Sequence, residues 1–154
     1  MNEPVGKWVL VTGTGDPRQK HARETALRVG ASLAEHGFGL VSGNALGVDK
    51  AVSEAFCRQA SVGSPNRAPR FVQVCLPWYN RGGLWPGRSF VPPRGAEIKR
   101  LAGEDEWLEA VHSAADAAVI LSGRAGTFKA AQRFIRGGKP VFPIPFTGGT
   151  SSWS

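Results

Sequence analysis

The most constraining feature of the sequence is a unit that recurs three times, in which a short apolar run enters a glycine-rich turn and then a helical pattern. The apolar runs lie at 8–11, 40–42 and 117–121, and the turns at 12–15, 43–47 and 122–127. Continuous apolar runs of this length are typical of strands buried on both faces of a parallel sheet. The recurring unit therefore predicts an α/β fold.

The remaining segments continue the same alternation of strand and helix. Apolar positions at helical spacing predict helices over 21–36, from 48 onward, over 104–115 and over 128–135. Two further strands are expected at 71–76 and 141–144. This order predicts a Rossmann-like, doubly wound, mostly parallel sheet with helices on both faces and ligands at the carboxyl ends of the strands.

Two segments lack helical or strand periodicity. Residues 60–70 carry turn formers and predict a surface loop. Residues 77–95 are rich in Pro, Gly, Arg and aromatic side chains. Because long irregular segments inside a compact domain are usually functional or disordered, we expect this one to form a lid or wall beside a ligand.

Length and composition limit the class of protein. A chain of 154 residues with 42% hydrophobic side chains supports one compact core, so residues 1–154 are expected to form a single domain. The net charge of +7 favours phosphates, nucleic acids or anionic surfaces as partners, although a solvated basic surface explains it equally well. Neither a secretory leader nor an apolar run of about 20 residues is present, which predicts a cytoplasmic protein and no membrane partner.

The two cysteines do not indicate a metal site. Cys57 and Cys75 both lie in apolar contexts and are expected to be reduced core residues. Their spacing matches no metal-binding motif. We therefore expect no metal and no cofactor other than a nucleotide-type ligand.

The three glycine turns carry the chemistry. A strand that delivers a glycine turn to a helix start exposes backbone N–H groups, and the helix dipole adds positive charge there. None of the turns has the Gly-Lys-Ser/Thr ending of a P-loop, so ATP hydrolysis is not expected. The candidate ligand-binding residues on these turns are Gly13, Thr14, Gly15, Ser42, Gly43, Asn44, Gly47, Ser122, Gly123, Gly126 and Thr127.

Side chains beside the turns complete the candidate site. Arg18 and Arg124 are the best candidates for phosphate partners, because a guanidinium binds two oxygens at once. Asp49 either contacts the ligand or only favours the dipole of its helix. Pro77 and Arg88 belong to the segment over 77–95, in which Trp78 and Trp85 form either an aromatic wall or a hydrophobic plug.

Two of the turns carry a family resemblance. The segment Ser-Gly-Asn-Ala-Leu-Gly-Val-Asp at 42–49 resembles the glycine segment of the SLOG superfamily, which groups DNA-processing protein A with the "lonely guy" phosphoribohydrolases. The segment Ser-Gly-Arg-Ala-Gly-Thr at 122–127 resembles the Pro-Gly-Gly-x-Gly-Thr-x-x-Glu signature of the same group. The match covers residues 8–149. It implies a Rossmann-like sheet with a nucleotide site between these loops.

The departures from the family pattern argue against catalysis. The position of the signature's glutamate is Ala130, and the position of the family's catalytic arginine is Trp107. Alanine neither carries a proton nor stabilises an oxocarbenium ion, so no catalytic residue is expected. Trp107 either stacks on a base or belongs to the core. The neighbouring helix carries four acids, Glu104, Asp105, Glu106 and Glu109. They either form a solvated helix start or replace the lost glutamate.

The sequence leaves several functions open. The resemblance implies a non-catalytic sensor for a nucleotide signal such as a cyclic ADP-ribose isomer or a related ADP-ribose derivative, as in antiphage systems. The alternatives are binding of single-stranded DNA, a nucleoside monophosphate phosphoribohydrolase with relocated acids, and, more weakly, a carrier of a pterin cofactor. The resemblance also implies a homodimer or homotetramer. The turn-like residues at 146–154 lead us to expect a further effector domain or a trimmed end.

Overall fold

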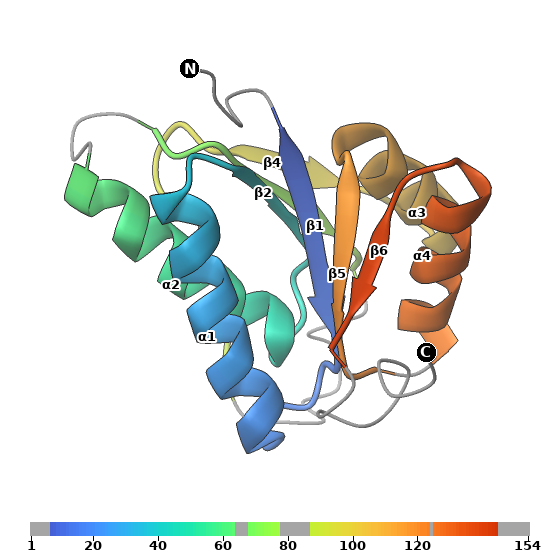
Figure 1. Ribbon diagram of the computed structural model, residues 1–154, viewed down its shortest axis with the longest axis horizontal. Coiled ribbons are helices and arrows are strands. Elements are labelled where there is room, and N and C mark those ends of the chain that lie inside the picture. The colour runs from blue at the N-terminus through green and yellow to red at the C-terminus, as the bar shows by residue number, and fades with distance from the viewer. Residues whose placement is uncertain (1–6, 64–67, 78–86, 124, 145–154) are drawn as a thin grey trace.

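The fold is an α/β sandwich built on one parallel sheet (Figure 1). The computed structural model describes residues 7–63, 68–77, 87–123 and 125–144. Within these residues the strands are β1 (Trp8–Gly13), β2 (Gly39–Ser42), β3 (Phe71–Cys75), β4 (Glu97–Arg100), β5 (Ala117–Leu121) and β6 (Val141–Pro143). They lie in the order β4-β3-β2-β1-β5-β6, and every neighbouring pair is parallel.

Helices cover both faces of the sheet. They are α1 (Lys20–Glu35), α2 (Val48–Gly63), α3 (Glu104–Ala114) and α4 (Ala125–Arg136). Figure 1 shows α1 and α2 together on one side of the sheet and α3 and α4 on the other. The expected Rossmann-like fold with helices on both faces is confirmed.

Alternating strand residues supply the two halves of the core. On β1, Leu10 faces the cluster beneath α3 and α4, whereas Val9 and Val11 face the cluster beneath α1 and α2. The first cluster contains Val111 and Phe134 from the two helices. Because the central strands are buried on both faces, they read in the sequence as continuous apolar runs.

The edge strand β4 is the element that the sequence pattern does not indicate. Its four residues are Glu-Ile-Lys-Arg, none of them buried, so there is no apolar run to recognise. Short, charged strands are typical of sheet edges, where exposed backbone groups would otherwise pair with another chain. Tertiary pairing with β3 places this segment in the sheet.

Two predicted boundaries are wrong. The loop expected over 60–70 begins later, because α2 continues to Gly63. The last helix begins at Ala125 and not at Phe128, so Gly126 and Thr127 belong to the first turn of α4. The other predicted strands and helices agree with the structure to within a residue or two at each end.

Phe134 on α4 provides a test of the packing. Its side chain is fully buried, whereas the neighbouring Ile135 is 56% exposed. We expect Phe134→Ala to lower the free energy of unfolding by about 3–5 kcal/mol, because it removes buried surface and leaves a cavity. Ile135→Ala is the matched control and should change it by no more than about 0.5 kcal/mol. Urea denaturation of both variants measures this, and similar losses would contradict the assigned face of α4.

Candidate functional site

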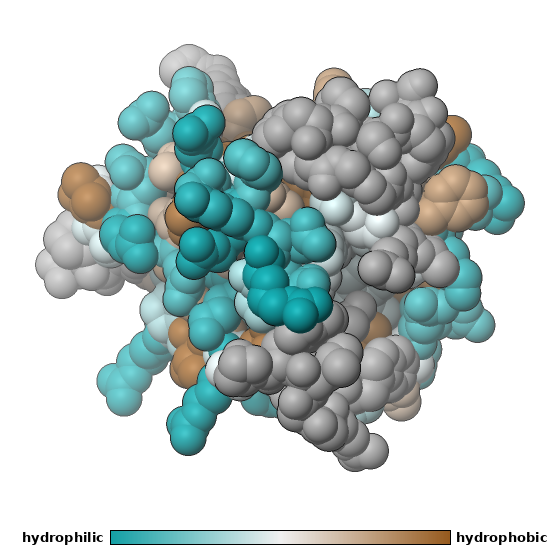
Figure 2. All heavy atoms as spheres, turned by 90° about the horizontal axis from the view of Figure 1, so that it is seen from below, coloured by the Kyte–Doolittle hydropathy of each residue, from teal (hydrophilic) through white to brown (hydrophobic). Residues whose placement is uncertain are grey.

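The order of the strands reverses between β1 and β5. The chain builds β2, β3 and β4 on one side of β1 and then returns to place β5 on the other side. In parallel α/β sheets, ligands bind at such a switch point, outside the carboxyl ends of the strands. Figure 2 looks onto this edge from below and shows mostly hydrophilic side chains in the middle of the described surface.

The three glycine turns meet at the switch point. The N–H of Thr14 donates to the carbonyl of Leu121 at 3.4 Å, which joins the first turn to the end of β5. The N–H of Val48 donates to the carbonyl of Thr14 at 2.9 Å, which joins the first turn to the start of α2. The hydroxyl of Thr127 donates to the carbonyl of Gly13 at 3.4 Å. The first turn therefore contacts both of the others.

Glycine is required where the turns touch. A Cβ atom at Gly13 would lie 1.9 Å from the carbonyl oxygen of Leu121, and one at Gly47 would lie 2.3 Å from that of Thr14. Both contacts are with backbone atoms that cannot swing away. These two glycines therefore allow the turns to approach one another, which is a structural role whether or not a ligand binds.

The backbone after β5 is in an unusual conformation. Ser122 has φ of 58° and Gly123 has φ of 145°, and Ser122 is the only non-glycine residue with positive φ in the described part of the chain. Its side chain is 6% exposed. Residues in sparsely populated backbone regions gather at ligand sites, because the surrounding structure must hold them there. This turn leads directly to the start of α4.

The second turn holds an anion that belongs to the protein. The carboxylate of Asp49 accepts the N–H of Ala45 at 3.1 Å and also that of Gly43. The residues at 43–49 are all buried, and burial raises the pKa of Asp49 to about 6. Two N–H donors of this turn therefore serve the Asp49 side chain.

Arg18 is also engaged within the protein. Its Nε and Nη2 atoms donate to the two carboxylate oxygens of Asp16, each at 2.9 Å. The Arg18 side chain is 75% exposed, and the pairing with Asp16 raises its pKa. A phosphate at the first turn would therefore compete with Asp16 for this guanidinium.

Comparisons with solved structures identify the fold. No protein-family model and no curated protein matches the chain. The structural genomics target TM1055 aligns with a TM-score of 0.71 and 23% identity, over 94% of this chain and 78% of that one. DNA-processing protein A from Helicobacter pylori aligns at 0.63 and 18%, over 96% and 70%. The molybdenum cofactor carrier protein from Chlamydomonas reinhardtii aligns at 0.64 and 18%, over 88% and 74%.

The protein shares the Rossmann-like fold of these structures. The Rossmann-like sheet that the motifs at 42–49 and 122–127 imply is thus confirmed. One fold hosts many functions, so the function must be argued from the site.

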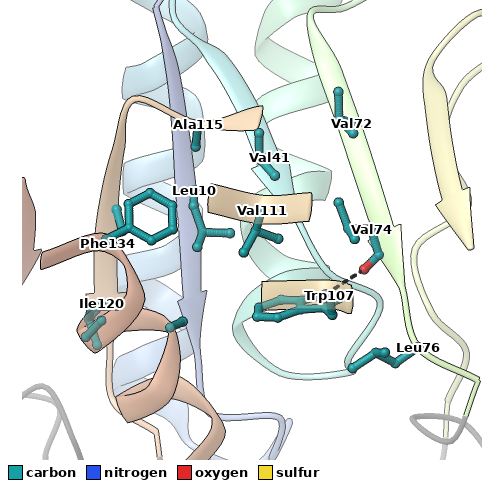
Figure 3. Close-up of a cluster of buried hydrophobic side chains, with 13 residues drawn as sticks. Leu10, Val41, Val72, Val74, Leu76, Trp107, Val111, Ala115, Ile120 and Phe134 are labelled. Carbon is teal, nitrogen blue, oxygen red and sulfur yellow. Dashed lines mark hydrogen bonds between the residues drawn. The ribbon is translucent and has the colours of Figure 1, made fainter. Parts of the chain in front are cut away.

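Both positions at which the sequence resemblance places catalytic residues hold core residues here. Ala130 is fully buried, and Trp107 is 5% exposed. The indole N–H of Trp107 donates to the carbonyl of Val74 at 3.0 Å, beneath Val111 in the same cluster (Figure 3). Core packing accounts for these contacts of Trp107, and base stacking by it stays a prediction.

Two of the four acids of α3 pair with cations of α4. Glu109 binds Arg133 through two hydrogen bonds of 2.8 and 2.9 Å, and Glu104 binds Lys129 at 2.8 Å. Glu104 is also the nearest neighbour of Gly126, since a Cβ atom built there would lie 3.8 Å from Glu104 Oε2. Glu104 is therefore the member of this acidic cluster placed beside the third turn.

Two predicted site residues line a different cavity. Asn44 and Pro77 border a cavity of about 360 Å³ at the ends of β3 and β4. The Asn44 amide donates to the carbonyl of Leu76 and accepts its N–H, both at 3.0 Å, so it anchors the second turn to the end of β3. Arg88 is exposed, and Arg124, Trp78 and Trp85 lie outside the described residues.

The structure adds two cations that sequence reasoning missed. Arg23 and Lys50 line a cavity of about 280 Å³ beside Pro17 and Gly47, with Glu54 on the same wall. Both cations lie in the first turn of a helix that follows a glycine turn. A cation in the first turn of such a helix could therefore have been identified from the sequence as a site residue, because side chains there point toward the carboxyl ends of the strands.

Neither a metal-binding group of side chains nor a membrane-spanning helix is found among the described residues. No group of three or more His, Cys, Asp or Glu side chains gathers there with the geometry to hold a metal ion. None of the helices in these ranges combines the length and apolar character needed to cross a bilayer.

Asp49 predicts how stability depends on pH. Its folded-state pKa of about 6 exceeds the ordinary aspartate pKa of 3.8, so the contribution of this group to stability is most favourable below pH 3.8 and is lost as pH rises toward 6. The shift corresponds to about 3 kcal/mol. Asp49→Asn keeps an oxygen that accepts the Ala45 N–H but cannot ionise. We expect its free energy of unfolding, relative to the wild type, to rise between pH 4 and 7.

Urea denaturation at several pH values measures this difference, with Asp105→Asn on the exposed start of α3 as the control. A difference between Asp49→Asn and the wild type that does not vary with pH would refute the assignment.

Proposed function

We propose that this protein binds a phosphate-bearing nucleotide at the switch point and does not cleave it. The observation that carries the proposal is the convergence of the three turns beside the left-handed Ser122–Gly123 backbone. This arrangement points a helix start at the place where ligands of parallel sheets bind. The basic balance of the chain favours an anionic ligand.

The phosphate belongs at the start of α4. The first N–H groups of any α-helix lack partners within the helix, and α4 has no acidic residue in its first turn. Gly126 in that turn is exposed. At α2, in contrast, the Asp49 carboxylate already takes two N–H donors of the turn. The start of α4 is therefore the better anion site of the two.

Further anionic groups of the ligand would contact the cations in the first turns of helices α1 and α2. Arg23 and Lys50 border the cavity beside Gly47, next to the contact between the first and second turns. They have no ion pair or hydrogen bond of their side chains in the described part of the chain. A ligand with two phosphates matches this pair of anion sites. This supports a cyclic ADP-ribose isomer or a related ADP-ribose derivative, and hence a signal sensor in antiphage defence.

A role as sensor also follows from the buried positions 107 and 130. A fully buried alanine and a buried tryptophan stand where the resemblance places the catalytic glutamate and arginine. Because neither position carries a side chain that transfers a proton or stabilises positive charge at the ribose, we expect the nucleotide to be bound and released intact.

Gly126→Ala is a sharp test of this proposal. The added methyl group meets only Glu104 Oε2 at 3.8 Å, so the fold tolerates it, but it covers the backbone that a phosphate must approach. We expect the affinity for the ligand to fall at least about tenfold, or roughly 1.4 kcal/mol. Stability should stay the same or rise, since alanine favours helix over glycine. Calorimetric titration with cyclic ADP-ribose isomers, ADP-ribose and cyclic dinucleotides measures the affinity.

Gly63→Ala is the matched control, because Gly63 also lies in a helix and has no atom within 4 Å of an added Cβ. It should leave affinity unchanged. Absence of binding by every nucleotide in the panel would refute the proposal, as would equal affinity of the Gly126→Ala variant and the wild type.

Binding of single-stranded DNA is the second candidate. The net charge of +7 favours it, and the Helicobacter pylori structure describes a single-stranded DNA binding mode for that protein. Contacts with many phosphates release counterions, so oligonucleotide affinity would fall steeply with salt. Oligonucleotide binding that free nucleotides do not displace would favour this function over the sensor.

Cleavage of nucleoside monophosphates is the third candidate, and Glu104 is the acid to examine. It is the acid of the α3 start that lies beside Gly126. We expect no release of free base from AMP by the wild-type protein, measured by chromatography over long incubation. Base release that is abolished by Glu104→Gln but kept in Glu106→Gln would instead establish a relocated catalytic acid.

A further inference from the structure

A cavity of about 360 Å³ lies against β3 and β4, away from the switch point. In the sheet, β2 separates β3 from β1, so the cavity and the junction of the glycine turns are distinct places. Its walls include Phe90, Val91, Pro92, Ile98 and Leu101. The cavity is therefore lined in large part by apolar side chains.

The register of the two strands places a thiol and a guanidinium together in this cavity. Cys75 pairs with Arg100, and Gln73 pairs with Ile98, so side chains two residues apart on each strand share one face. Val72 and Val74, which alternate with them on β3, face the opposite core beneath α3. Gln73, Cys75, Ile98 and Arg100 accordingly all line the cavity.

Most polar groups on the wall are already bonded within the protein. The Gln73 amide donates to the carbonyl of Phe90 at 2.9 Å, and the Cys75 thiol donates to Gln73 Oε1 at 3.3 Å. The Ser89 hydroxyl donates to the carbonyl of Asn44 at 2.5 Å. The Arg100 guanidinium, in contrast, has no ion pair or hydrogen bond within the described ranges. One cation is thus available on an otherwise satisfied wall.

We propose that this cavity is a second ligand site, which binds a small organic carboxylate with a flat apolar body. The guanidinium of Arg100 matches a carboxylate in geometry and charge, because its planar fork binds both oxygens at once. The apolar walls, which include Phe90 and Ile98, accept the ligand body. The volume falls at the lower end of the range for ligand pockets, about 300–1,000 Å³, which suits a ligand of one or two rings.

The test compares 2-naphthoate with its neutral isostere 2-naphthamide, by calorimetry on the wild-type protein at fixed salt. We expect the carboxylate to bind at least about tenfold more tightly than the amide, since hydrogen bonds to charged groups are the stronger ones. Arg100→Gln should abolish this preference. Arg94→Gln is the matched control, because Arg94 is exposed on the same segment and does not line the cavity.

Cys75 reports where the ligand binds. In a Cys57→Ser background it is the only thiol of the chain, and its rate of reaction with a neutral maleimide can be followed by mass spectrometry. Saturating 2-naphthoate should slow this reaction at least about fivefold, and Arg100→Gln should remove the protection at the same ligand concentration. An excess of the nucleotide that binds at the switch point should not displace 2-naphthoate.

Three results would overturn the proposal. These are absence of 2-naphthoate binding to the wild-type protein, an equal preference for the carboxylate in Arg100→Gln and the wild type, and binding that leaves the reaction of Cys75 unprotected. Because Arg100 is exposed, its substitution should not unfold the protein, and a thermal melt of each variant verifies this.

Discussion

The architecture of the candidate site depends on the close approach of the backbone at Gly13 to the carbonyl of Leu121. Their pairing brings the ends of β1 and β5 together at the switch point, and a Cβ atom at Gly13 would lie 1.9 Å from that carbonyl oxygen. Thr14 links this contact to both neighbouring elements. Its N–H donates to the carbonyl of Leu121, and its carbonyl accepts the N–H of Val48 at the start of α2. A side chain at position 13 would separate the strands and with them the starts of α2 and α4.

The two glycine turns beside this contact both present backbone N–H groups at a helix start, but these groups face different surroundings. At α2, the protein supplies its own anion, and the buried Asp49 carboxylate takes the N–H groups of Gly43 and Ala45. At α4, the left-handed Ser122–Gly123 backbone leads to a first turn that has no acid and has an exposed glycine. The Asp49 carboxylate fixes the geometry of the turn before α2, whereas the start of α4 is the phosphate site that we propose.

The two faces of the sheet also have different roles. Beneath α3 and α4 lies an apolar core cluster, which includes both positions, 107 and 130, at which the sequence resemblance places catalytic residues. Ion pairs such as Glu109–Arg133 and Glu104–Lys129 lie at the surface of this pair of helices. The opposite face carries the cavity over β3 and β4. Apart from Asn44, the residues that line that cavity come from outside the glycine turns.

The sequence by itself determined the fold class and the identity of the turns. Central strands buried on both faces must be continuously apolar, and helices that cover a sheet must show apolar positions at helical spacing, so both can be read locally. The charged edge strand β4 escaped this reading, since an exposed strand needs no apolar run. What only the tertiary structure decided is where each polar group is used. The Asp49 carboxylate accepts an N–H of its own turn, and the Trp107 indole donates to the carbonyl of Val74. Cys75 and Arg100 pair across two strands that are separated in the sequence. Hydrogen-bond partners and burial are set by chain packing, and residue type alone does not specify them.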